Sequence, residues 1–402
     1  MENPKIRFKG FTKDWEQRKF GDVFKEYSEK NHTELSALTI IQGGGTVKRE
    51  DSDRNLMYDT SNLSNYKMVR KDDFIVHLRS FEGGLEKSSL DGIISPAYHT
   101  FHSDMADSRF YYPYFRSYEF IKHKLVPHVY GIRDGRSIDI DGMKTIEIPY
   151  TSIEEQRKIG DYLDCLDHLI TLHQRKCEQT KNLKKYMLQK MFPKNGAKVP
   201  KIRFDGFTYD WEQRKLGDVI DDMYNGQTPS RNKSEYWNGT IKWLSSGELN
   251  RGTVYDSIET ITEEGQKAAN LKIVPKGTFV MAITGLEAAG TRGNCALLGF
   301  DTTLNQSCMA LFPKQEMLTS EFLFQWYRKV GEEYGINYTQ GTKQQSYNAE
   351  LIKILPISLP SVGEQRKIFS YLSHLDHLIT LHQRKCDELK KMKKYMLQNM
   401  FI

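Results

Sequence analysis

Two histidine–cysteine pairs have the spacing of metal ligands on a helix. His173 and Cys177 are four residues apart, as are His382 and Cys386, so each pair would lie on one helical face. Two such helices that meet could supply the two cysteines and two histidines of a zinc site. The same positions also fit an apolar seam, in which cysteine packs as a small hydrophobic residue and histidine marks the register. We favour the seam and expect no metal.

No catalytic motif of the common phosphotransferase, methyltransferase or hydrolase classes occurs in the chain. Residues 43–48, Gly-Gly-Gly-Thr-Val-Lys, lack the spacing of a phosphate-binding loop and are better explained as a turn. None of the twelve prolines adjoins another, which excludes the Asn/Asp-Pro-Pro-aromatic motif of amino-methyltransferases. A nucleophile elbow and a His-Glu-x-x-His helix are absent as well. The sequence therefore predicts a protein that is not itself an enzyme.

Long segments of the sequence occur twice. Residues 4–23 return at 200–219 with three changes, and residues 166–177 return unchanged at 375–386. Such long-range identity predicts two half-length copies rather than a solenoid, whose repeats run to about 20–50 residues. The protein is expected to have an internal pseudo-twofold symmetry.

The segments between the repeats differ and predict two α+β bodies. They contain β-branched and aromatic runs bounded by turn residues, with strands expected near residues 73–78, 277–283 and 308–312. Short helices are expected at residues 111–123 and 320–334. Each copy thus has a repeated framework around a variable body.

The repeated segments at 154–192 and 363–401 predict long helices. Apolar residues recur at intervals of four and three, which is the pattern of a coiled-coil seam. The seam includes Leu163, Leu166 and Ile170 in the first helix, and Leu372, Leu375 and Ile379 in the second. About 37 residues would make a rod of roughly 55 Å. An antiparallel pair of these helices would hold the two bodies at opposite ends.

These patterns predict the following division of the chain. The first domain spans 1–152, the first helix 153–192, a linker 193–199, the second domain 200–361 and the second helix 362–402. The repeated Trp15 and Trp211 are expected to be buried and to close each half against its helix. Lysines on the helices, including Lys181, Lys184 and Lys393, form either a solvated face or contacts to phosphate.

Composition sets broad limits on the protein. In 402 residues there are 38% hydrophobic and 27% charged residues, which is enough to form several globular cores. A net charge of +6 suits an anionic partner but does not identify one. The five cysteines include no Cys-x-x-Cys pair, and no apolar run approaches the length of a membrane span. The start of the chain does not resemble a secretory signal, so we expect a cytoplasmic protein.

The motifs, taken in order, resemble the specificity (S) subunit of a Type I restriction-modification enzyme over essentially the whole chain. The resemblance is carried by Trp-Glu-Gln-Arg-Lys-Phe-Gly-Asp at 15–22 with its copy at 211–218, Glu-Gln-Arg-Lys-Ile at 155–159 and 364–368, Gly-Gln-Thr-Pro-Ser at 226–230, Tyr-Trp-Asn-Gly-Thr-Ile-Lys-Trp at 236–243 and Gly-Thr-Lys-Gln-Gln at 341–345.

This resemblance implies that each body is a target recognition domain and that the paired helices act as a ruler. It implies that the chain binds double-stranded DNA, that two modification (methyltransferase) subunits dock on the repeated segments, and that two restriction subunits can join. The chain would be non-catalytic. The complex would use S-adenosylmethionine for adenine methylation and ATP with Mg for cleavage.

Base recognition needs arginine for guanine, asparagine or glutamine for adenine, and small residues that let a loop enter a groove. In the first body these are Gln42, Gly44, Arg79, Ser80, Phe81, Arg133, Arg136 and Ser137. In the second body they are Ser230, Arg231, Ser245, Ser246, Thr284, Arg292, Asn305, Gln306, Thr342, Lys343, Gln344 and Gln345. Because the bodies differ, the expected target is bipartite and asymmetric. The alternative is a coiled-coil scaffold that gathers two partner proteins without recognising DNA.

Overall fold

The computed structural model describes residues 4–52, 60–131, 136–194, 197–288, 290–341 and 345–401. It divides into two compact units. The first unit comprises Met1–Arg175 and Gln383–Ile402, and the second comprises Lys176–His382. Each unit therefore combines one variable body with a part of each long helix. We refer to them as the first and second unit and to their bodies as the first and second body.

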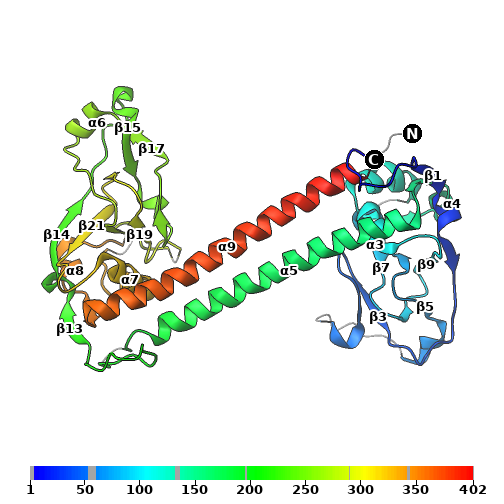
Figure 1. Cartoon of the computed structure of the whole chain (residues 1–402), viewed down its shortest axis with the longest axis horizontal. Coiled ribbons are helices and arrows are strands. Elements are labelled where there is room, and N and C mark those ends of the chain that lie inside the picture. The colour runs from blue at the N-terminus through cyan, green and yellow to red at the C-terminus, as the bar shows by residue number, and fades with distance from the viewer. Residues whose placement is uncertain are drawn as a thin grey trace. The chain divides into compact units, whose positions relative to one another are not determined.

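The first body is built on a four-stranded antiparallel sheet in the order β2-β9-β6-β7. Strands β7 and β9 of this sheet are labelled in Figure 1. Its elements are β1 (Glu16–Lys19), α1 (Phe20–Val23), β2 (Lys25–Tyr27), β3 (Leu38–Ile41), β4 (Gly45–Lys48), β5 (Lys67–Val69), β6 (Phe74–Val76), α2 (Ser80–Gly83), β7 (Glu86–Lys87), β8 (Gly92–Ile94), β9 (His99–His102), α3 (Ser108–Phe115), β10 (Val129–Tyr130), β11 (Ser137–Ile138), α4 (Ile140–Lys144) and β12 (Glu147–Tyr150). Strand β1 pairs with β12, so the first repeated segment is joined to the strand that precedes the first long helix.

The second body has the same strand order with additions. Its main sheet runs β14-β21-β18-β19-β16, and a separate sheet runs β17-β15-β20. Its elements are β13 (Glu212–Lys215), β14 (Ile220–Asn225), β15 (Trp237–Leu244), β16 (Thr253–Val254), β17 (Glu259–Ile261), α6 (Glu263–Ala268), β18 (Phe279–Ala282), β19 (Cys295–Leu298), β20 (Thr303–Leu304), β21 (Cys308–Pro313), α7 (Ser320–Asn337), α8 (Ala349–Lys353) and β22 (Pro356–Leu359). Strand β13 pairs with β22, as β1 does with β12. The two bodies therefore share a framework.

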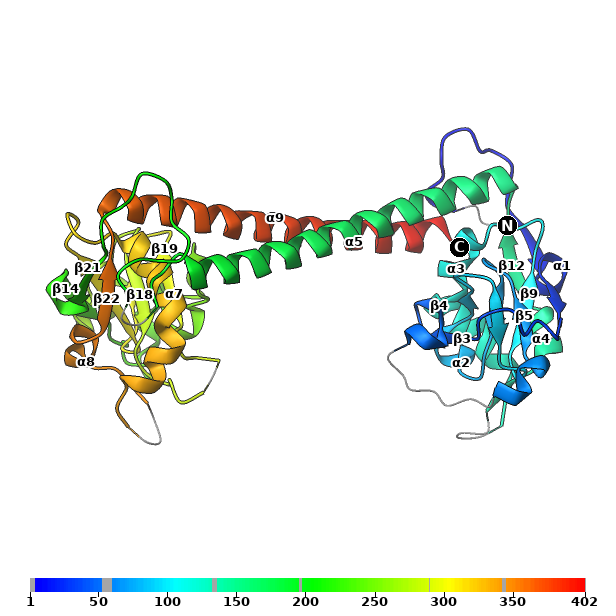
Figure 2. The ribbon, with the colours of Figure 1, turned by 90° about the horizontal axis from the view of Figure 1, so that it is seen from below.

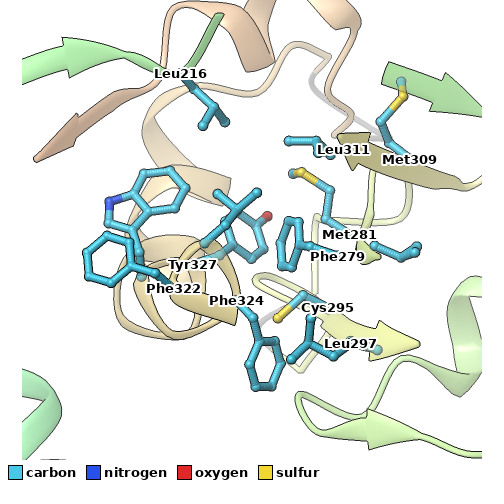
Figure 3. Close-up of a cluster of buried hydrophobic side chains, with 14 of the residues drawn as sticks. Leu216, Phe279, Met281, Cys295, Leu297, Met309, Leu311, Phe322, Phe324 and Tyr327 are labelled. Carbon is cyan, nitrogen blue, oxygen red and sulfur yellow. The ribbon is translucent and has the colours of Figure 1, made fainter. Parts of the chain in front are cut away.

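A helix packs on each main sheet and forms the core. Figure 3 shows Phe279 of β18 beside Tyr327 of α7, and their ring centres are 5.6 Å apart. In the first body Phe74 packs against Phe115 of α3 at 5.0 Å. The predicted helix at 320–334 is confirmed. The predicted helix at 111–123 is confirmed in part, because α3 ends at Phe115 and a separate helical segment spans Phe120–Leu125. The Ser117 hydroxyl accepts the Phe120 N–H at 3.1 Å and starts this second segment.

The two predicted long helices are present as α5 (Ile153–Lys190) and α9 (Val362–Met400). The residues at the end of each helix pack in the other copy's body: those at the end of α9 in the first body, and those at the end of α5 in the second. In the first unit Phe401 lies 5.0 Å from Phe110 of α3, as the position of the chain end beside α3 in Figure 2 illustrates. In the second unit Phe192 lies 5.5 Å from Phe322 of α7. Each core is therefore completed by both helices.

The predicted seam residues divide between two environments. Leu166 and Ile170 form a buried cluster with Cys386 and Leu389, as expected for helix–helix packing. Leu163 instead lies in the core of the first body, and Leu372 and Leu375 lie in the core of the second. Ile379 is half-buried, and its carbonyl lies 3.8 Å from the Cys177 sulfur. Helix–helix packing is thus confirmed for Leu166 and Ile170, whereas Leu163, Leu372 and Leu375 are buried in the cores of the bodies instead.

The repeated helix-start motif fastens each helix to its body. Arg7 forms two hydrogen bonds with Glu155 at 2.6 and 2.7 Å, and Arg203 does the same with Glu364 at 2.8 Å. Gln156, which follows Glu155, accepts the Asp107 N–H at the start of α3 at 2.9 Å. Because the carboxylates of Glu155 and Glu364 are buried, both oxygens of each need hydrogen-bond donors. The sequence repeat therefore reflects the same arginine–glutamate contact between helix and body in both copies.

Candidate nucleic-acid interface

Several predicted base-contacting residues of the first body lie on one surface. Gln42 is exposed at the tip of the β3–β4 hairpin, and its amide nitrogen would be 2.0 Å from a Cβ placed on Gly83. The guanidinium of Arg136 lies 4.4 Å from the ring centre of Phe81 and 3.5 Å from Glu82 Oε1. We call this site the first loop cluster; it comprises the exposed Gln42, Arg79 and Arg136 with Glu82, above Phe81, whose side chain is buried at 7% exposure. It brings together amide and guanidinium donors from three distant segments.

Other predicted residues of the first body shape these loops. Ser80 is fully buried, and its hydroxyl accepts the His77 N–H at 2.9 Å. Gly44 donates its N–H to the Ile41 carbonyl at 2.8 Å within the hairpin. Ser137 is half-buried in β11, which pairs with β10. Arg133 lies outside the described residues. Ser80 therefore holds the turn that presents Arg79, and its burial prevents a base contact in this conformation.

In the second body, one group of predicted residues surrounds the turn before β21. Thr228 donates its hydroxyl to the side chain of Gln306, which is exposed. Asn305 is only 9% exposed, and its side-chain oxygen accepts the Ser307 N–H at 3.1 Å. Ser245 bonds Glu248 Oε1 through its N–H at 2.9 Å and its hydroxyl at 2.8 Å, which starts the turn that contains Ser246. Gln306 thus faces solvent, while Asn305 and Ser245 fix the backbone.

Arg231 has an extensive set of contacts. Its guanidinium lies 3.7 Å from the ring centre of Trp237, and Nη2 donates to Glu259 Oε2 at 2.9 Å. The hydrogen bond from Arg231 holds the pKa of the Glu259 carboxyl below its ordinary value. The Ser230 carbonyl accepts the Trp237 indole N–H at 3.2 Å, which closes the turn. The guanidinium is therefore pre-oriented and retains N–H donors that do not face Glu259.

Two of the remaining predicted residues of the second body, Arg292 and Gln345, meet at Glu287. Arg292 Nη2 donates to the Glu287 carbonyl at 2.8 Å, and the Gln345 N–H donates to Glu287 Oε2 at 3.3 Å. Thr284 lies at the start of the same loop and is half-buried. Three further predicted residues, Thr342, Lys343 and Gln344, lie outside the described residues. The segment that contains Gln345 is thus tied to the loop that carries Arg292.

The acidic residues that hold these donors are not predicted from the sequence. Glu86, Glu259 and Glu287 each accept hydrogen bonds from a segment that contains a predicted base-contacting residue. Looking for base contacts in a sequence favours side chains that donate hydrogen bonds. A loop that presents such donors also needs acceptors that hold its own backbone and side chains in place. The signal for Glu86 and Glu259 is an acidic residue within a short strand.

The helices contain an ion-pair triad that corrects the prediction for Lys184. This lysine is buried, and its ammonium contacts Asp376 of α9, which also accepts from Arg328 of α7 at 2.7 Å. Burial and the nearby Arg328 lower the pKa of Lys184 to about 8, although Asp376 acts in the opposite direction. The equivalent Lys393 pairs with Asp167 at 2.6 Å at a more exposed site. Lys184 is therefore not on a solvated face, and Lys393 is held in an ion pair.

The described residues contain no cluster of three or more histidine, cysteine, aspartate or glutamate side chains that could hold a metal ion. None of the helices in this described part combines the length and the apolar character that a membrane span requires.

Comparisons with known proteins place this geometry in a wider context. A family model for the Type I restriction modification DNA specificity domain matches residues 12–182 and 209–391. The specificity subunit of Type I restriction enzyme MjaIX from Methanocaldococcus jannaschii is 31% identical over 210 residues, which are 51% of this chain and 45% of that protein. The EcoR124I/EcoR124II specificity subunit from Escherichia coli is 28% identical over 173 residues, which are 42% of this chain and 41% of that protein.

The matches to these two relatives thus cover less than half of their length. A structure of the Type I restriction-modification S subunit from M. genitalium matches 100% of this chain and 99% of that chain, with a TM-score of 0.60 and 14% sequence identity. At this identity the match is a likeness of fold.

Proposed function

The chain belongs to the Type I restriction-modification DNA specificity family, and from this premise we propose that it is the non-catalytic subunit that selects the DNA target of such a complex. The observation that carries the proposal is the pair of bodies. Both have the same core strand order, yet the loops at Gln42 and Arg231 differ in sequence and in contacts. A shared framework with unlike loops suits the recognition of two unlike sequences.

The proposed target is double-stranded DNA with two different half-sites. Each body would contact one half-site through its loops, and the paired helices would set the spacer between them. Guanine and adenine present hydrogen-bond acceptors in the major groove. Arginine and glutamine side chains that neighbouring groups hold in place can donate to these acceptors. Lengthening both helices by one turn would change the spacer and leave the half-sites unaltered.

The proposed partners are two modification subunits, which would dock on the repeated segments, and two restriction subunits. S-adenosylmethionine for adenine methylation would be bound by the modification subunits. ATP with Mg for cleavage would be bound by the restriction subunits. We assign none of these groups to residues of this chain. We expect the complex to act in the cytoplasm.

The test is single-molecule methylation sequencing of DNA from cells that express this chain with its modification subunit. The matched control is the same cell without this chain. A split motif of two unlike half-sites that is methylated only in the presence of the chain would support the proposal. If no new motif arises while the modification subunit is active with another specificity subunit, the scaffold alternative would be favoured.

A further inference from the structure

Glu86 is a buried carboxylate in the first body with four donors around it. Its side chain is 0% exposed. Its oxygens accept the Gly43 N–H at 2.7 Å, the Gly45 N–H at 3.2 Å and the Tyr112 hydroxyl at 2.8 Å, and Arg116 supplies a counter-charge. Burying a carboxylate is costly unless it is paired and hydrogen-bonded. Here the donors include two backbone amides from one hairpin.

The hairpin is shaped to meet Glu86. Gly43 and Gly45 have φ angles of +80° and +73°, which favour glycine. A Cβ on Gly43 would be 2.9 Å from Arg116 Nη2, and one on Gly45 would be 2.6 Å from the Ser89 hydroxyl. The backbone of the tip therefore lies directly on the groups that surround the carboxylate.

The same hairpin carries Gln42 into the first loop cluster. Gln42 precedes Gly43, and its amide lies against Gly83 in the turn that also carries Arg79 and Phe81. Two exposed apolar side chains, Ile41 and Leu78, adjoin Gln42 and Arg79 in the sequence and are 45% and 61% exposed. The position of Gln42 relative to Arg79 thus depends on where the hairpin tip is held.

The second body has a different residue at this place. In the β6–β7 pair Glu86 lies opposite Ile75, and in the β18–β19 pair Ala296 lies opposite Val280. The strands correspond because the order β2-β9-β6-β7 of the first body matches the order β14-β21-β18-β19 of the second. A residue that changes from a buried acid to alanine within a shared framework is not required by the framework.

We propose that Glu86 is a positioning residue for the specificity of the first body, because it fixes the tip of the β3–β4 hairpin and so sets where Gln42 meets one half-site. The inference rests on the proposed function of DNA recognition. Without the carboxylate, the Gly43 and Gly45 amides lose their acceptor and the hairpin tip moves away from the Arg79 turn. Recognition at one half-site is then relaxed, while the other half-site and the spacer are unaffected.

The test compares Glu86→Ala and Glu86→Gln with Asp73→Asn by methylation sequencing with the modification subunit. Asp73 is the matched control, because it is a buried acid directly before β6 of the same body, and its carboxylate oxygens bond Tyr27 and His102 rather than the hairpin. We expect Glu86→Ala to reduce discrimination at one or two positions of one half-site by about tenfold. Asp73→Asn should retain the motif even where it lowers the thermal midpoint.

Each outcome decides between separate ideas. An unchanged motif in a folded Glu86→Ala chain, or equal loss at both half-sites, overturns the inference. If Glu86→Ala fails to fold, Glu86→Gln decides by the same criterion, because it keeps the size of the side chain. Hydrogen exchange at Gly43 and Gly45 should be faster in the folded variant. If the unaltered chain produces no split motif, the proposed function itself fails, whatever the variants do.

Discussion

One arginine position serves different purposes in the two units. Arg116 and Arg328 each follow the N-cap of their helix, Asp107 or Thr319, by nine residues. Each guanidinium lies over the aromatic ring one turn earlier, at 5.5 Å and 5.0 Å from the ring centre. The two arginines therefore occupy equivalent places in the shared framework.

Their ion-pair partners differ, and so does the residue at one position of the sheet beneath them. Arg116 pairs with Glu86, which holds the hairpin of the first body. The second body has Ala296 at the place of Glu86, and Arg328 pairs with Asp376 of α9 instead. A single sheet position thus correlates with whether the arginine fixes a loop or a helix. In the first unit this arginine therefore anchors a loop, and in the second unit it anchors helix α9.

The largest expected effect concerns the helix anchors. Asp376→Ala would leave Lys184 and Arg328, with side chains 7% and 15% exposed, without their shared counter-charge. We expect a loss of about 2–4 kcal/mol in the unfolding free energy of the second unit, toward the lower part of the range for broken buried pairs because Asp376 is partly exposed.

The matched control is Asp167→Ala in the first unit, where the Lys393 pair is more exposed and should cost less than about 1 kcal/mol. Segment-resolved hydrogen exchange would measure both variants. Equal losses in the two units would contradict the asymmetry.

A comparison of Arg79 with Arg231 would sharpen the difference between the loops. Each arginine replaced by alanine should relax a single base position by about 1–3 kcal/mol, and the two affected positions should lie in different half-sites. Binding assays with DNA variants at fixed salt would measure this. Replacing the exposed Lys181 should weaken all sequences alike if it contacts phosphate. An Arg79 variant that weakens all sequences equally would be rejected as base-contacting.

Acid should affect the second unit through Asp376. Burial by itself would raise the pKa of Asp376, but Arg328 and Lys184 outweigh it and hold the pKa below its ordinary value. At a pH between the lowered pKa of folded Asp376 and the ordinary pKa of the unfolded chain, only the unfolded chain binds the proton. The stability of the second unit therefore falls as the pH falls. We expect the unfolding free energy of the second unit to fall as the pH is lowered through the ordinary pKa of aspartate, about 3.9, and below it. Urea unfolding at several pH values would measure it, and Asp376→Asn should remove this part of the dependence.

The smallest expected difference separates the two repeated tryptophans. The Trp15 indole N–H donates to Glu155 at 3.2 Å, whereas the Trp211 indole nitrogen is buried without a hydrogen-bond partner in the described residues. Trp15→Phe should therefore destabilise its unit by about 1 kcal/mol more than Trp211→Phe does. Thermal unfolding that is followed separately for each unit would measure this, and a larger loss for Trp211→Phe would contradict it.

The framework could be predicted from the sequence because repetition and periodicity are local signals. The repeat located α5 and α9, and the apolar runs located β6, β18 and β21. The burial of Trp15 and Trp211 was also predictable, since both recur in the same motif, and both are confirmed as buried. These predictions depend on neighbouring residues in the chain, which the sequence shows directly.

The positions of individual polar side chains could not be predicted in the same way. Lys184 has the same sequence surroundings as its copy Lys393, yet it is buried because Arg328 and Asp376 come from distant segments. Ser80 and Asn305 have the residue types of base contacts, but both are buried in turns. Which polar residue faces solvent is decided by long-range packing, and so the base-contacting assignments remain predictions.

The completion of the first unit by residues near the end of the chain has a consequence for synthesis. Phe401 packs against Phe110 and Trp15, and the Ile6 N–H bonds the Asn399 carbonyl at 3.0 Å. The second unit draws only on residues 176–382. At about 5–20 residues per second, the ribosome would need roughly 10–45 s after Arg175 to supply the missing segment. The first body is made first, but its unit is the later one to become whole, so during that time its core lacks the apolar residues that the end of α9 supplies.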